Sequence, residues 1–230
     1  MDKMTVNEKE VKRQLWKQKL TGMERLTEQE RNVLHLAGLK YEGNVSFLYT
    51  LNECLVEGCK FIEDEEHDIQ YERDRENHFL ISDRQEIQFT YQEIRELVAS
   101  MIDIFEEVFP LGSLVVLKKE HMDKVPNIRE VEEVRIVVTH RYLFQENSRY
   151  YFPYAGVVYP TGMLGRKEVL NFTSALVEKV LHKGYRDEQE DAYHYLMKHE
   201  LIIERGMHSF AFADKKTLDA YSAELKRQGE

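Results

Sequence analysis

Side chains that bind metals are abundant in this chain of 230 residues, but their spacing does not form a metal site. His194 and His199 are five residues apart, which places them on different sides of a helix. The zinc-peptidase pattern, two histidines four residues apart with a glutamate after the first, is absent. The stretch 57–76 holds nine Asp or Glu against three Lys or Arg, yet it lacks the alternating aspartates and the glycine of a calcium loop. We therefore expect no metal and no cofactor.

The serine and glycine motifs of hydrolases and nucleotide-binding proteins are also incomplete. Ser113 lies in Leu-Gly-Ser-Leu, which lacks both glycines of a Gly-x-Ser-x-Gly nucleophile elbow. The segment 162–165 begins and ends with glycine, but it lacks the Gly-Lys-Ser/Thr of a phosphate loop. These gaps predict a protein that is not an enzyme.

The two cysteines, Cys54 and Cys59, have no second pair with which to form a zinc site. If both lie on one helix, they are about 7.5 Å apart along its axis and on diverging faces. That geometry is poor for a disulfide. We therefore expect two free thiols in a reducing compartment.

Aromatic side chains offer a different chemistry, the recognition of another protein. Four tyrosines, at positions 150, 151, 154 and 159, are unusually close in sequence, and the single tryptophan lies on a thinly amphipathic helix expected at 7–20. Such rings either pack in a core or supply contact area at a binding surface. The candidate protein-binding residues are Trp16, Tyr151, Tyr154 and Tyr159.

The elements that position these residues indicate an α+β protein. Residues 1–108 read as a mostly helical N-terminal region with a β-hairpin near 78–90. Two capping boxes, Thr27 with Glu30 and Thr90 with Glu93, predict helix starts. The second opens the clearest amphipathic helix, to about Val108.

Residues 109–200 read as an antiparallel β-rich domain, either a sheet or a small barrel, followed by a helix at 187–199. Strands are expected at 114–117, 134–139, 149–154, 155–159 and 179–182. Residues 201–230 predict a hairpin around Arg205-Gly206 and a last helix capped by Asp214. This helix–hairpin–helix order leaves a winged-helix transcriptional regulator as a weaker alternative.

Charge and hydropathy exclude several classes of partner. The formal net charge is −10, which disfavours nucleic acid and anionic membranes. No apolar run approaches the roughly 18 residues of a membrane span. Residues 1–20 are charged and lack the apolar core of a signal peptide, so we expect a cytoplasmic protein.

Four motifs follow one another from Phe109 to Glu188, and together they carry a family resemblance. The first is Phe-Pro-Leu-Gly-Ser-Leu-Val-Val-Leu-Lys, beginning at Phe109, and the second is the β-branched strand 134–138. The third comprises Tyr154, Gly156, Tyr159, Pro160 and Gly162, and the fourth comprises Asn171, Val180, Gly184, Tyr185, Asp187 and Glu188. In this order the motifs resemble domain-of-unknown-function family 4176, over about residues 109–190.

The resemblance implies a companion protein of type VII secretion in Gram-positive bacteria. Members of the family look like adaptors or chaperones, encoded beside toxins that carry an LXG-type helical targeting domain. The expected partner is therefore an LXG-type toxin, held in the cytoplasm before export. An alternative is an immunity protein, whose acidic patch Glu63 to Asp68 would imitate phosphate against a basic nuclease toxin.

Overall fold

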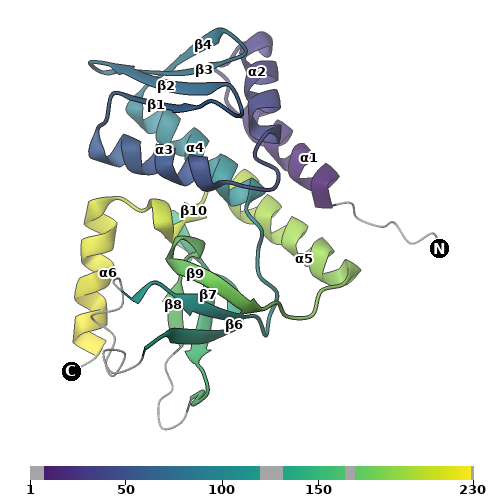
Figure 1. Ribbon diagram of the computed structural model, residues 1–230, viewed down its shortest axis with the longest axis vertical. Coiled ribbons are helices and arrows are strands. Elements are labelled where there is room, and N and C mark those ends of the chain that lie inside the picture. Colours follow the sequence, from purple (N-terminus) through teal and green to yellow (C-terminus); the bar gives the residue numbers. More distant parts are fainter. Residues whose placement is uncertain (1–7, 120–131, 164–168, 229–230) are drawn as a thin grey trace, which may run out of the picture. The chain divides into compact units, whose positions relative to one another are not determined.

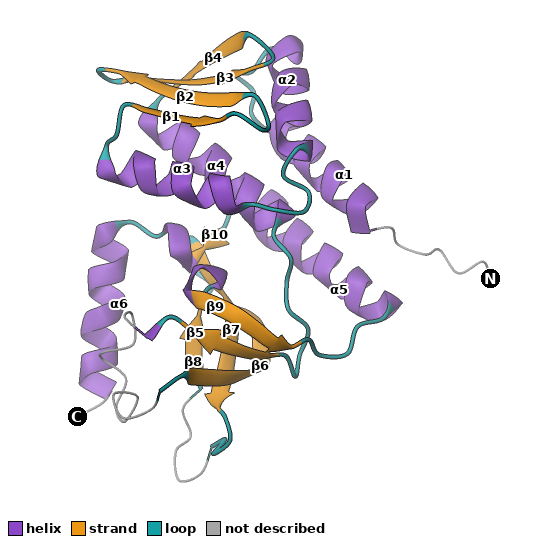
Figure 2. Cartoon of the chain, in the orientation of Figure 1, coloured by secondary structure: helices purple, strands orange, loops and turns teal. Residues whose placement is uncertain are grey.

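The computed structural model describes residues 8–119, 132–163 and 169–228. Helices dominate the N-terminal part, β-sheets follow in the middle and further helices end the chain, which confirms the α+β class (Figure 2). The chain forms two compact units, which are described separately. The first comprises residues 1–108 and 186–206, and the second comprises 109–185 and 207–230. Residues 186–200 thus group with the N-terminal region, in contrast to the predicted domain 109–200.

The first unit combines five helices with a four-stranded antiparallel meander. The strands follow the order β1-β2-β3-β4, and helices α3 and α4 lie along the sheet (Figure 1). The strands are β1 (Phe61–Asp64), β2 (Ile69–Asp74), β3 (Asn77–Ser82) and β4 (Gln85–Phe89). The helices are α1 (Glu8–Thr21), α2 (Glu28–Leu39), α3 (Ser46–Glu57), α4 (Tyr91–Phe105) and α5 (Glu188–Lys198).

The predicted hairpin corresponds to β3 and β4, whereas β1 and β2 were not predicted. Both of these strands lie in the acidic stretch 57–76. Alternation explains why it can pair: in β2, Ile69 and Tyr71 are buried while Glu72 is exposed. A strand with one solvated face tolerates a carboxylate at every second position.

Both predicted capping boxes are formed. The Thr27 and Thr90 hydroxyls accept from the backbone N–H of Glu30 and Glu93, whose carboxylates accept from the threonine N–H groups. From Thr90, α4 runs through the core, and every residue from Leu97 to Phe105 is buried. Its predicted apolar stripe is therefore confirmed as packing surface.

The prediction of free thiols is wrong, because Cys54 and Cys59 form a disulfide. The prediction assumed one continuous helix, but α3 ends at Glu57 and Gly58 adopts a left-handed conformation with φ 76°. This turn folds the chain back, so the two Cα atoms are 5.1 Å apart, within the range for a disulfide.

The second unit is built on a six-stranded sheet. Its strand order is β10-β7-β6-β5-β9, with β8 also pairing with β7, and all pairs are antiparallel except β10 with β7. The strands are β5 (Leu114–Leu117), β6 (Val134–Phe144), β7 (Tyr150–Val158), β8 (Leu170–Phe172), β9 (Val177–His182) and β10 (His208–Ser209). Between β8 and β9 lies the short 3-10 helix η2 (Ser174–Leu176).

Strand β7 continues through Pro153, so the two strands predicted at 149–154 and 155–159 form one strand. On its second edge, β10 pairs with residues 150–151 and β8 pairs with residues 154–156. Pro153 falls between these two short partners, so its missing N–H is not required there.

The predicted hairpin around Arg205-Gly206 is also wrong. Residues His199–Glu204 form a π-helical segment, η3, which continues α5 and buries Leu201 and Ile202 in the first unit. A 3-10 turn, η4 (Phe210–Phe212), and helix α6 (Lys215–Gln228) then complete the second unit. Without that hairpin, the main structural reason for a winged-helix regulator is lost. No helix within the described ranges is long and apolar enough to span a membrane.

Candidate functional site

Three of the four predicted protein-binding residues are buried within their own units. Trp16 lies in the core of the first unit, where its Nε1–H donates to the Leu34 carbonyl at 3.0 Å and its ring meets the Phe105 edge. Tyr151 and Tyr154 are buried in the second unit. A buried ring offers no contact area to a partner, so the prediction of Trp16, Tyr151 and Tyr154 as contact residues is wrong. Tyr159 alone is exposed, at 47%.

Tyr154 has a structural role that explains its burial. Its hydroxyl accepts from the backbone N–H of Phe109 at 3.1 Å, and its ring stacks on those of Phe109 and Phe172. It therefore ties strands β7 and β8 to the first residue of the segment that leads into β5.

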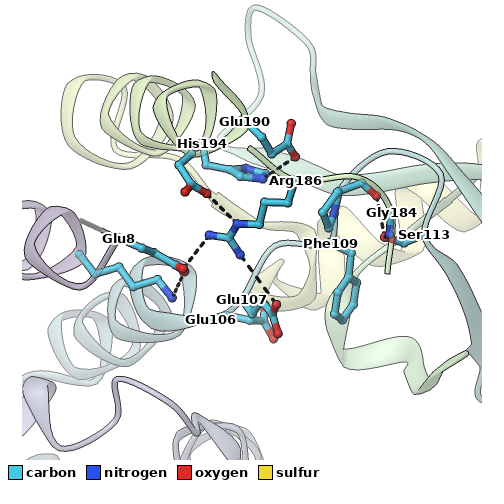
Figure 3. Close-up of polar contacts among 12 residues, drawn as sticks. Glu8, Glu106, Glu107, Phe109, Ser113, Gly184, Arg186, Glu190 and His194 are labelled. Atoms are coloured by element: carbon cyan, nitrogen blue, oxygen red, sulfur yellow. Dashed lines mark hydrogen bonds and ion pairs between the residues drawn. The ribbon is translucent and has the colours of Figure 1, made fainter. Parts of the chain in front are cut away.

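Other motif residues also hold the second unit together. The Ser113 hydroxyl donates to the Pro110 carbonyl at 2.7 Å and accepts from the Gly184 N–H at 3.0 Å; Figure 3 labels Ser113 and Gly184. Gly184 has no space for a Cβ atom, which would overlap the Leu111 carbonyl. The first and last motifs thus meet in a close backbone contact, which explains why a glycine stands there.

Tyr185 departs from this pattern. It follows Gly184 directly, yet its side chain is 80% exposed. Leu111 and Leu181 of the same unit are exposed as well.

In the first unit, α5 is packed with its polar side inward. The only side chains that this helix buries are His194 and Lys198, whereas Leu196 is 63% exposed and Tyr193 is 40% exposed. Tyr193 and Leu196 are three residues apart, so they are neighbours on one face. We call Tyr193 and Leu196 the outer face of α5.

The unusual orientation of α5 follows from the end of α4. The last carbonyls of an α-helix have no partner within the helix, and the helix dipole favours cations there. Lys198 Nζ donates to the Ile104 carbonyl at 2.8 Å and the Glu106 carbonyl at 3.0 Å. Lys12 from α1 donates to the Phe105 carbonyl at 3.1 Å. Two lysines thus satisfy a buried helix terminus, and one of them must come from α5.

Ion pairs at the start of α5 fix the same orientation (Figure 3). Arg186 pairs through Nε with Asp191 and through Nη2 with Glu8, both at 2.6 Å. His194 Nε2 lies 2.9 Å from a carboxylate oxygen of Glu190. The Asp187 carboxylate accepts from the N–H groups of Gln189 and Glu190, both at 3.0 Å, and caps the helix.

A cavity of about 30 Å³ remains between these groups, lined by residues that include Lys12, Arg186, His194 and Lys198. This volume has room for about two water molecules. Burial lowers the pKa of Lys198 to about 7, and the charge of Lys12 acts in the same direction. Burial alone would raise the pKa of Glu8, but Lys12 and Arg186 outweigh it and the pKa is lowered. Val11, Leu15 and Val108 also line the cavity, so its walls are apolar as well as charged.

The sequence predicts the helix at 187–199 but not the exposed apolar face that it carries. The spacing of His194 and Lys198, one turn apart and on the opposite side from Leu196, was the available signal. This spacing can be interpreted only with the knowledge that α4 ends next to Lys198, which the sequence does not provide.

The described residues contain no group of three or more His, Cys, Asp or Glu side chains that could hold a metal ion. Residues 108–193 match the family model described as "Domain of unknown function (DUF4176)", which confirms the resemblance. The matched segment includes Tyr185 and Tyr193. No curated protein and no solved structure matches the chain.

Proposed function

We propose that this protein is a non-catalytic cytoplasmic adaptor or chaperone, which binds an LXG-type toxin of a type VII secretion pathway before its export. The family match supports this proposal through the resemblance described above. The single structural observation that supports it is the reversed polarity of α5, which exposes Tyr193 and Leu196 while it buries a lysine and a histidine.

The outer face of α5 suits a helical client. Side chains three or four residues apart form ridges, and the ridges of one helix pack into the grooves of another. An amphipathic helix of the toxin's targeting domain would cover Tyr193 and Leu196 in this way. Because α5 is held from its polar side, covering its outer face requires no rearrangement of the unit.

An immunity protein is the second candidate, and the acidic turn between β1 and β2 favours it. Asp64 is engaged within the unit, since its carboxylate accepts from the Tyr41 hydroxyl and lies 2.8 Å from His67 Nδ1. Glu65, Glu66 and Asp68 are exposed. Three exposed carboxylates on one turn would suit a basic toxin surface.

Co-expression with the toxin encoded beside this protein separates the two candidates. The toxin is tested at full length, as its targeting half and as its toxic half, and both co-purification and cell survival are scored. Binding of the targeting half without rescue supports the adaptor, whereas binding of the toxic half with rescue supports immunity. Binding of neither half contradicts both proposals.

A further inference from the structure

Cys54 and Cys59 are positioned for reversible chemistry that the proposed function does not use. Cys54 lies in the last turn of α3 and is buried, whereas Cys59 lies beyond the helix and is half-buried. Their Cα separation of 5.1 Å suits a disulfide. Cys59 is thus the more exposed of the two residues and the one that a reagent from solvent reaches more readily.

The backbone holds the two residues together independently of the sulfur atoms. The N–H groups of Gly58 and Cys59 both donate to the Cys54 carbonyl, at 2.9 and 3.0 Å. Gly58 supplies the left-handed turn between them, with φ 76°. None of these interactions requires a sulfur–sulfur bond, so we expect the same turn in the reduced chain.

We propose that Cys54 and Cys59 form a reversible dithiol–disulfide couple, oxidised by exchange with a low-molecular-weight disulfide. The Cys59 thiolate attacks the small disulfide, forms a mixed disulfide and releases one small thiolate. The Cys54 thiolate then attacks the Cys59 sulfur and releases the second small thiolate. The two protons lost by the cysteines are taken up by the two released thiolates. Two electrons pass from the protein to the small disulfide.

The redox state of Cys54 and Cys59 depends on the compartment in which the protein is found. Cytosolic glutathione keeps protein thiols reduced, whereas disulfides persist in oxidising environments. The chain would therefore be a dithiol where we propose that it binds its client, and it would become cross-linked where oxidants prevail. The oxidised form joins the end of α3 covalently to the residue that precedes β1 by two positions.

The test uses the full chain without any client, so its outcome is independent of the proposed function. The protein is equilibrated with glutathione buffers of decreasing reduced-to-oxidised ratio, quenched with acid and labelled with a polyethylene-glycol maleimide. We expect two labels in reducing buffer and none in oxidising buffer, with monomeric mass and no bound glutathione. Persistence of both labels in fully oxidised glutathione overturns the proposal, as does a stable glutathione adduct or a disulfide-linked dimer on the wild-type chain.

Two single variants test the assigned order of attack. In Cys54→Ser the accessible sulfur remains without its resolving partner, so we expect one stable glutathione adduct by mass spectrometry. In the matched control Cys59→Ser only the buried sulfur remains, and we expect the adduct to form at least tenfold more slowly. Equal rates in the two variants contradict the assignment of Cys59 as the attacking residue.

Discussion

Helices α4 and α5 belong to the same unit, but α4 buries mainly apolar side chains whereas α5 buries polar ones. Helix α4 buries every residue from Leu97 to Phe105, and the apolar residues among them follow the helical spacing that the sequence predicts. Helix α5 buries His194 and Lys198 and leaves Leu196 exposed. The difference shows that a helix can be oriented by the polar groups it must satisfy, and not only by its apolar stripe.

The two orientations are linked, because the end of one helix determines the orientation of the other. The core position of α4 buries its final carbonyls, and an unpaired buried carbonyl costs roughly 1–3 kcal/mol. Lys198 supplies two of the missing donors. The apolar residues that α5 leaves outside are therefore available for contact with a partner.

The largest expected effect is a pH dependence of the stability, which tests whether burial lowers the pKa of Lys198. Lys198 has its pKa lowered from 10.5 to about 7, so between these values the unfolded chain binds a proton that the folded chain does not. Stability contributed by this group should therefore be lowest below pH 7 and should rise as the pH approaches 10.5. The full difference between the two pKa values corresponds to roughly 5 kcal/mol.

The measurement is the free energy of unfolding of the wild type and of Lys198→Met between pH 6.5 and pH 10. Other titrating groups are common to both chains, so the difference isolates Lys198. We expect the wild type to gain stability relative to the variant as the pH rises. Parallel curves would show that Lys198 keeps an ordinary pKa.

The second prediction compares one leucine from each helix. Leu97→Ala in α4 removes a fully buried side chain and should cost about 3 kcal/mol. Leu196→Ala in α5 removes an exposed one and should change stability by less than about 0.5 kcal/mol. Denaturant unfolding measures both. Equal costs would mean that the outer face of α5 is covered by the chain itself.

The third prediction on stability concerns the start of α5. Asp187→Ala removes the acceptor for two N–H groups and should cost about 1 kcal/mol. Asp187→Asn keeps a capping oxygen and should be close to the wild type. Thermal unfolding of the two variants checks the difference, and identical melting temperatures would remove Asp187 as a stabilising cap.

Much of α4 but little of the packing of α5 was predictable from the sequence. The reason is that the interactions that determine the two helices span very different distances along the chain. The capping boxes at Thr27 and Thr90 join residues three positions apart, so sequence reveals them directly. Lys198 instead meets carbonyls more than ninety residues away. Periodicity cannot identify such a partner, so the orientation of α5 could not be predicted from the sequence.

The same argument applies to the other errors. Cys59 was placed on a helix because the turn at Gly58 was not recognised, and β2 was missed because its carboxylates concealed an alternating strand. Trp16 and Tyr154 were offered as contacts because aromatic sequence alone does not separate packing from recognition. Their partners, the Leu34 carbonyl and the Phe109 N–H, come from other elements.

Client binding by variants of two exposed leucines tests the central claim most directly. Leu196→Asp places a charge on the outer face of α5, and Leu36→Asp places the same charge on α2, where the leucine is 54% exposed. Calorimetric titration with the toxin's targeting half should show at least tenfold weaker binding for Leu196→Asp and unchanged binding for Leu36→Asp, with both variants as stable as the wild type. Wild-type affinity in a folded Leu196→Asp chain would contradict the assignment of the outer face of α5 as the client-binding surface.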